Sequence, residues 1–128
     1  MSKQVILVDD SKTILASSEM AFEDMIDEGL ITIATYVNPI EMLDDVRSGK
    51  ITYDLAILDI NMPQMNGLDL ARELKTDPSL KMKPVLMLTT ESSGDMKAKG
   101  KEIGVTGWMV KPFSDAKLVK SVKMVLGL

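Results

Sequence analysis

The chain has 128 residues, of which 45% are hydrophobic and 27% charged, values typical of a single soluble globular domain. It contains no Cys and no His, which excludes disulfides, thiolate or imidazole catalysis and zinc sites that depend on sulfur. The net charge is −4, but residues 1–60 alone carry a net −8, which argues against nonspecific binding to nucleic acid. No targeting signal and no apolar run long enough to span a bilayer is present, so we expect a cytoplasmic protein that binds neither DNA nor membranes.

Short apolar runs alternate with amphipathic segments along the chain. The runs predict strands at residues 3–9, 31–37, 55–58, 84–89 and 107–110. Between them, Ser11 caps a first helix that we predict to continue without interruption to about Glu28. The second helix begins at Asn38-Pro39, and its predicted inward face is Ile40, Leu43 and Val46.

Three further helices are predicted. One follows the Asn66-Gly67 turn, with Leu70, Ala71 and Leu74 inward, and the last is capped by Ser114, with its apolar stripe at residues 118–126. The helix between them starts at Ser93-Gly94-Asp95. It is predicted to be the weakest, because Gly100 lies inside it and Gly there costs about 1 kcal/mol relative to Ala.

Five strand–helix alternations with short connections predict an α/β fold with a parallel sheet and helices on both of its faces. The fold class is therefore a doubly wound (βα)5 sheet of the flavodoxin-like kind. Its strand order, 2-1-3-4-5, is adopted from other sheets of this class and does not follow from the sequence itself. We expect residues 1–128 to form one domain with no separate output domain, so that output occurs by protein contact.

Polar residues stand where four of the apolar runs end. Asp9 and Asp10 follow the first run, Asp59 ends the third, Thr89 ends the fourth and Lys111 follows the fifth. In a parallel sheet these ends share one edge, where ligands bind. Each residue alone has an ordinary interpretation, since strand-end acids and threonines cap helices and a lone lysine is usually solvated. Their joint placement is what predicts a site.

Three carboxylates at one edge repel one another unless a cation neutralises them. Because only oxygen ligands are available, Mg²⁺ is the natural ion, and Mn²⁺ would also fit. A phosphoryl group placed beside such an ion needs further charge relief, which the Lys111 ammonium and the Thr89 hydroxyl can supply. Asp59 could then attack phosphorus in line and form an acyl phosphate.

Four segments together resemble the receiver domain of two-component response regulators, and most closely its stand-alone chemotaxis members. They are Val8-Asp9-Asp10-Ser11, the segment from Leu58 to Gly67, Leu88-Thr89-Thr90-Glu91, and Trp108-Met109-Val110-Lys111-Pro112-Phe113. The resemblance covers the whole chain in order and at the usual spacing, and four linked signatures are far more specific than one.

The resemblance implies that Asp59 accepts a phosphoryl group from a phosphohistidine of a sensor histidine kinase. It further implies that Asp10, Asp59 and the backbone carbonyl of Asn61 ligate Mg²⁺, while Asp9 acts mainly through water. Thr89 and Lys111 would contact the phosphoryl group, in a reaction that the domain catalyses on itself, including its later dephosphorylation. The protein would then be a signalling phosphoacceptor and no enzyme in the ordinary sense.

Other implications concern switching and partners. Thr89 and Trp108 would be the switch residues, Trp108 standing where the family often has Tyr or Phe, and Asn61 and Glu91 could tune dephosphorylation. The Lys111-Pro112 bond is commonly cis in the family. The face formed by the fourth helix, fifth strand and fifth helix would dock an output protein such as a flagellar motor switch protein, and a phosphatase would be a further partner.

Three alternatives remain open. A regulator in another phosphorelay, for sporulation or pilus motility, could look much the same. A small haloacid-dehalogenase-type phosphatase also uses a strand-end Asp, Mg²⁺, Thr and Lys, but it normally needs a second acid at the position of Asn61. A phosphate-independent adaptor would keep the acids for structural reasons.

Overall fold

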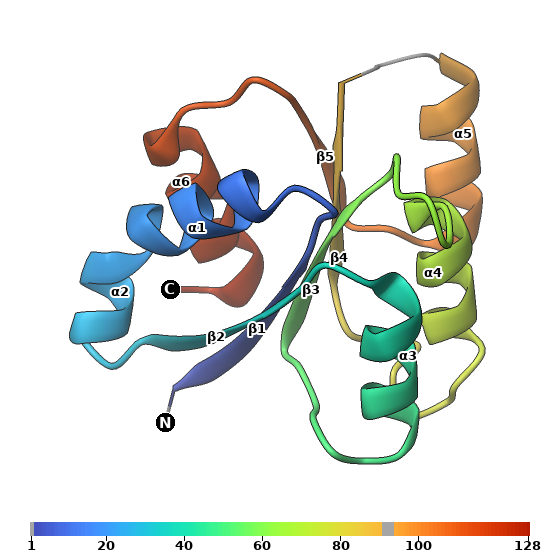
Figure 1. Cartoon of the computed structure of the whole chain (residues 1–128), viewed down its shortest axis with the longest axis horizontal. Coiled ribbons are helices and arrows are strands. Elements are labelled where there is room, and N and C mark those ends of the chain that lie inside the picture. Colours follow the sequence, from blue (N-terminus) through green and yellow to red (C-terminus); the bar gives the residue numbers. More distant parts are fainter. Residues whose placement is uncertain (1, 91–93) are drawn as a thin grey trace.

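The structure, a computed structural model, describes residues 2–90 and 94–128 and is a five-stranded parallel sheet with helices on both faces (Figure 1). The strands are β1 (Lys3–Val8), β2 (Ile31–Tyr36), β3 (Leu55–Asp59), β4 (Val85–Thr89) and β5 (Gly107–Val110). The helices are α1 (Lys12–Ala21), α2 (Glu23–Asp27), α3 (Pro39–Arg47), α4 (Gly67–Lys75), α5 (Gly94–Ile103) and α6 (Asp115–Leu126). The predicted starting residue of α5, Ser93, lies outside the described residues.

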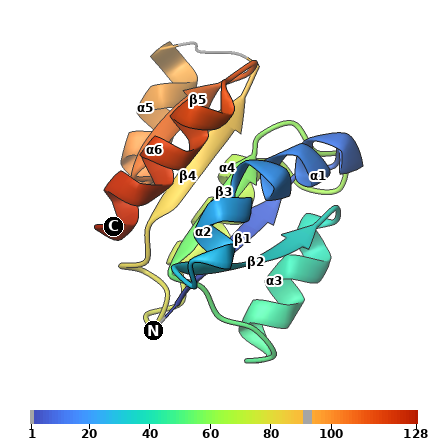
Figure 2. The same ribbon diagram turned by 90° about the vertical axis from the view of Figure 1, so that its left-hand side faces the viewer.

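The sheet has the order β2-β1-β3-β4-β5, with every neighbouring pair parallel, which confirms the predicted doubly wound class and its strand order. Figures 1 and 2 show α1, α2 and α6 on one face and α3, α4 and α5 on the other. Alternate residues of each strand therefore enter different cores: in β1, Val5 and Leu7 join one and Ile6 and Val8 the other. Both faces of the central strands are buried under helices, which is why the sequences of these strands are continuously apolar.

The polar residues that were predicted to start helices do so. Ser11 Oγ accepts a hydrogen bond from the Ile14 N–H, and Ser114 Oγ accepts one from the Lys117 N–H. Asn38 Oδ1 accepts from two backbone N–H groups of the first turn of α3. These bonds satisfy donors that have no partner within the helix, and they fix where each helix leaves the strand before it. No helix among the described residues is both long and apolar enough to cross a membrane.

Two details of the helices differ from the prediction. The first helix is not continuous, because Phe22, with ψ of 2°, interrupts it between α1 and α2. Phe22 is fully buried at this break, while Ile26 in α2 is 38% exposed. In α3 the inward stripe contains Met42 in place of Ile40, which is 37% exposed. Ile40 falls outside the stripe because residues 42, 43 and 46 form one continuous face of the helix.

Packing explains the glycine inside α5. Gly100 is buried, and a Cβ atom built on it would lie 2.5 Å from Cζ2 of Trp108 and 3.1 Å from its Cε2. The indole ring thus occupies the space that a side chain at position 100 would need. Glycine lowers the helix propensity at this position, but its lack of a side chain lets α5 lie close enough to the sheet to pack on the ring.

Gly100→Ala is expected to displace the Trp108 ring, although Ala is the better helix former. Trp108 is the only tryptophan, so its emission maximum should shift to longer wavelength as the ring moves toward water. Gly94→Ala is the matched control in the same helix, because no atom of the described residues lies within 4 Å of a Cβ built there. Equal emission spectra for the two variants would show that the ring does not depend on Gly100.

Candidate functional site

The ends of four strands bring the predicted site residues to one edge of the sheet. Parallel register pairs Val8 with Leu58, Asp59 with Leu88 and Thr89 with Val110. The residues that end or follow these strands therefore lie side by side. Asp9 and Thr89 are completely buried and Asp59 is 4% exposed. Buried polar side chains of this kind need partners, so the strand ends form a polar centre in an otherwise apolar sheet.

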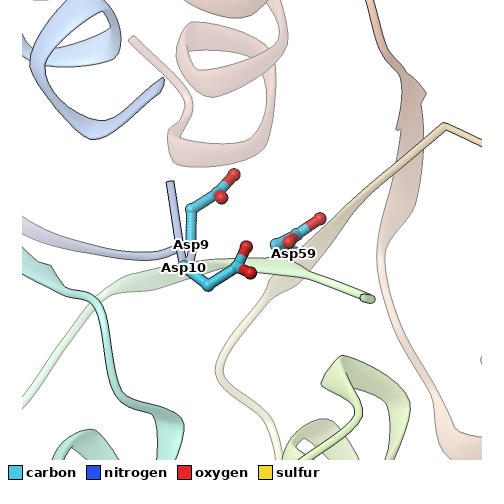
Figure 3. Close-up of side chains that lie close together, drawn as sticks. All are labelled: Asp9, Asp10 and Asp59. Atoms are coloured by element: carbon cyan, nitrogen blue, oxygen red, sulfur yellow. The ribbon is translucent and has the colours of Figure 1, made fainter. Parts of the chain in front are cut away.

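Three carboxylates meet in this centre. Asp9, Asp10 and Asp59 each offer an oxygen atom that lies within 4.8 Å of the oxygens of the other two. Figure 3 shows the three side chains leaving the ends of β1 and β3 toward the same space. Asp10 is exposed, whereas the other two are buried, so the cluster opens to solvent on the side of Asp10.

Among the described residues, Lys111 is the cation that contacts these acids. Its Nζ lies 2.9 Å from Asp9 Oδ2 and 3.0 Å from Asp59 Oδ1, and its side chain is 13% exposed. Burial alone would lower the pKa of Lys111, but the hydrogen bonds to Asp9 and Asp59 outweigh it and the pKa is raised. The lysine is therefore held as an ammonium ion, and one cation faces three carboxylates.

Asp59 has a raised pKa. Burial is the largest cause, and the negative charges of Asp9 and Asp10 add to it, while the hydrogen bond and charge of Lys111 act in the opposite direction. A carboxylate in this state is stabilised by any further positive charge that approaches it.

Asp9 serves two purposes at once. Its Oδ1 accepts a hydrogen bond from the Ser11 N–H at 2.9 Å, while Oδ2 accepts from Lys111. The turn before α1 and the acidic cluster thus share one side chain. Asp9 fixes this turn but does not cap the helix, because the N-cap of α1 is Ser11. Since both of its oxygens already accept hydrogen bonds, Asp9 is less available to a cation than Asp10.

The chemistry of this centre fits a hard divalent cation. All the side-chain ligands that it offers are oxygens, and three carboxylates exceed the single charge of Lys111. Mg²⁺ prefers such ligands and keeps several of its own waters, and the exposure of Asp10 leaves room for these. Asp10 and Asp59 are side chains that could hold such an ion.

The remaining predicted residues are placed as follows. Asn61 is exposed, two residues beyond the end of β3, and Glu91 lies outside the described residues. The Lys111-Pro112 peptide is cis, which confirms the expectation from the resemblance. Trp108 is half-buried in β5 and packs with the core beneath α3 and α4, so it does not join the carboxylates.

One residue that positions the site was missed by sequence reasoning, which interpreted Asn66-Gly67 only as a turn. The Gly67 N–H donates to the Ile60 carbonyl at 2.9 Å, and a Cβ on Gly67 would collide with the backbone carbonyl of Asp59. The start of α4 thus lies directly against the end of β3. The Asn-Gly pair was the available signal, because Gly also marks close approach of two backbone segments.

Residues 5–123 match the response regulator receiver domain. The chain belongs to this family. It is 31% identical over 122 residues to the chemotaxis protein CheY of Pseudomonas aeruginosa, covering 95% of this chain and 94% of that protein. It is 32% identical over 124 residues to the chemotaxis protein CheY1 of Helicobacter pylori, covering 97% of each. The matched family confirms the resemblance: the chain is the receiver domain of a two-component response regulator.

Solved receiver structures have the same fold. The chemotaxis response regulator CheY4 of Vibrio cholerae superimposes with a TM-score of 0.86 at 34% identity, over 98% of this chain and all of that one. The BeF3-activated receiver domain of DrrB from Thermotoga maritima gives a TM-score of 0.84 at 25% identity and complete coverage of both chains. The similarity thus extends over the whole described sheet and its helices.

Proposed function

We propose that this receiver domain accepts a phosphoryl group on Asp59 from a phosphohistidine of a sensor histidine kinase, and that phosphorylation switches its binding to other proteins. The observation that carries the proposal is the setting of Asp59. The residue is 4% exposed at a strand end. Its carboxylate lies 3.0 Å from the Lys111 ammonium and belongs to a cluster with Asp9 and Asp10.

In the proposed reaction a carboxylate oxygen of Asp59 forms a bond to phosphorus while the bond from phosphorus to the imidazole nitrogen of the donor breaks, and that nitrogen keeps the electron pair. Lys111 moves its hydrogen bond from the carboxylate to a phosphoryl oxygen, and the Thr89 hydroxyl contacts another. Bound Mg²⁺, or Mn²⁺, supplies charge neutralisation on the phosphoryl oxygens. Asp10, Asp59 and the Asn61 carbonyl would hold it, with Asp9 acting through water.

Mass spectrometry tests this assignment. Protein incubated with acetyl phosphate and Mg²⁺ is expected to carry a single base-labile phosphate, located on Asp59 by peptide mapping. Asp59→Asn should carry none, because an amide cannot form the acyl phosphate. Phosphate on another residue, or equal labelling of the variant, would contradict the proposal.

Asp10→Asn is expected to be more stable than the wild type without Mg²⁺ and less stable than the wild type when Mg²⁺ is present. In metal-free buffer the variant should be more stable than the wild type by about 1 kcal/mol, because one like charge is removed from an exposed position near two others. Mg²⁺ at a hundred times its Kd should stabilise the wild type by about 2.7 kcal/mol and the variant much less. Urea unfolding with and without Mg²⁺ measures both effects.

Asp44→Asn is the control for this experiment, because Asp44 is exposed on α3, away from the cluster. It should respond to Mg²⁺ as the wild type does. If Asp10→Asn gained as much stability from Mg²⁺ as the control, the acidic cluster would not be the metal site.

Trp108 and Thr89 are proposed as the switch. Phosphorylation would draw Thr89 toward the phosphoryl group and reorient the ring of Trp108 against α5. The expected result is a change in tryptophan emission when Mg²⁺ and beryllofluoride, a phosphoryl mimic, are added together. The change should be absent in Asp59→Asn, and a constant spectrum in the wild type would mean that the ring stays fixed.

A role in chemotaxis is proposed from the names of the relatives, which are chemotaxis proteins matched over nearly their whole length. The protein would act in the cytoplasm, and its phosphodonor would be a chemotaxis-type histidine kinase. The output partner would be a flagellar motor switch protein bound to the α5–β5–α6 face, which is the predicted face of the fourth helix, fifth strand and fifth helix, because the first predicted helix is divided into α1 and α2. A phosphatase would end the signal. Asn61 and Glu91 would tune autodephosphorylation. Binding of a motor switch peptide that needs phosphodonor in the wild type and fails in Asp59→Asn would support this and exclude an adaptor that ignores phosphate.

A further inference from the structure

Helices α1, α2 and α6 form one face of the molecule (Figure 2). Two of its apolar side chains are strongly exposed. Met20 on α1 and Met124 on α6 are each 72% exposed. Between the end of α1 and α6 runs a groove of about 610 Å³, whose lining includes Ala21, Val119 and Met124. Met124 is the flexible methionine that lines this shallow groove, and Met20 is exposed on α1 outside it. Exposed methionines beside a shallow groove lined by small side chains are typical of a surface that packs against another protein.

Charge divides this face into two halves. The α1–α2 half carries five exposed acids, and the α6 half carries three exposed lysines; they are Glu19, Glu23, Asp24, Asp27 and Glu28 on the first and Lys117, Lys120 and Lys123 on the second. The exceptions, Lys12 and Asp115, stand at the N-terminal ends of α1 and α6. No ion pair between described residues includes any of these side chains. Both halves therefore keep their charge available to a partner.

This arrangement selects the kind of partner. A uniformly acidic segment would be repelled by the α1–α2 half, and a uniformly basic one by the α6 half. A second copy of the chain, turned about a twofold axis that passes through the groove, places each basic half on an acidic half and brings the apolar residues of both copies together at the centre. An apolar centre with a polar rim is the usual anatomy of an interface, and a twofold axis is the usual symmetry of a dimer.

We propose that the α1–α2–α6 face binds a second copy of this chain in an isologous dimer. This inference does not depend on the phosphoacceptor role of Asp59, because it rests on a separate surface. Helix α5 lies on the opposite face of the sheet and stays uncovered in such a dimer (Figure 1).

Sedimentation velocity of the full chain tests the proposal. The weight-average mass should rise above the 14.1 kDa of one chain as concentration increases, and it should fall again at high salt, which screens the charges. Lys120→Glu/Lys123→Glu reverses the basic half, and Glu23→Lys/Asp27→Lys reverses the acidic half. Each variant alone should remain a monomer, and circular dichroism checks that each is folded.

The decisive measurement is a mixture of the two variants. In the mixed pair, the unaltered acids of one variant meet the unaltered lysines of the other, and the reversed halves also meet opposite charge, so association should return. Lys97→Glu/Lys101→Glu on α5 is the control and should associate as the wild type does. A single 14.1 kDa species at every soluble concentration would overturn the proposal, as would association that survives both reversals or a mixture that stays monomeric.

Discussion

Lys111→Met is expected to lower the free energy of unfolding in metal-free buffer by roughly 3–5 kcal/mol, the usual cost of leaving a buried charge without its partner. Lys111 bridges two buried carboxylates, at 2.9 Å from Asp9 and 3.0 Å from Asp59. Methionine fills a similar space but carries no charge, so the acids would face only one another. The loss should shrink as the pH falls, because Asp59 already has a raised pKa and a protonated carboxyl needs no counter-ion.

A double-mutant cycle isolates the cause. Asp59→Asn in the Lys111→Met background should restore part of the lost stability, because it removes one of the two unpaired charges. Mg²⁺ should restore part of it as well, since the ion replaces the missing positive charge. Lys97→Met, at an exposed position on α5, is the control and should cost less than about 0.5 kcal/mol. Equal costs for the two lysines in urea unfolding would show that the bridge contributes nothing.

Gly67→Ala is expected to destabilise the fold by about 3 kcal/mol and to reduce phosphorylation by acetyl phosphate. A Cβ at this position would overlap the backbone carbonyl of Asp59 and lie 2.9 Å from Cα of Ile60. Backbone atoms cannot rotate away as a side chain can, so α4 or the end of β3 must shift, and overpacking of this kind typically costs about 1–3 kcal/mol. The shift would move the carboxylate that is proposed to attack phosphorus.

Gly94→Ala is again the matched control, because it adds the same atom at a position that no neighbouring described residue crowds. It should leave both properties nearly unchanged. Urea unfolding measures the first effect and the rate of labelling by acetyl phosphate the second. If Gly67→Ala were as stable and as quickly labelled as Gly94→Ala, then Gly67 would not position the end of β3.

The strands and the candidate site were predictable from the sequence for one reason. An apolar run that ends in Asp59, Thr89 or Lys111 indicates both a buried strand and the residue at which that strand ends. Parallel topology then places the ends of these strands at one edge of the sheet. Serine and asparagine at helix starts were equally informative, because their capping bonds are local. Signals that depend on a few neighbouring residues were therefore interpreted correctly.

What failed or was missed depends on tertiary contacts. The break at Phe22 and the outward position of Ile40 follow from how each helix fits the sheet, which periodicity alone does not determine. From the sequence alone, Gly100 only weakens its helix, whereas the structure shows that the Trp108 ring occupies the space that a side chain at position 100 would need. Likewise, the Asn66-Gly67 pair can signal a close approach of two backbone segments, but it does not indicate that the second segment is Asp59. No local pattern indicates that one lysine reaches two acids.

The Lys111 bridge also bears on how the protein matures after synthesis. Its bond to Asp59 joins residues 52 positions apart, and its bond to Asp9 joins residues 102 positions apart. A nascent or clipped chain that lacks the last strand has the acids without the lysine and carries an unbalanced cluster. Competence for the chemistry proposed at Asp59 would then arise only once the entire sheet has assembled, so incomplete copies would be silent in the signalling pathway.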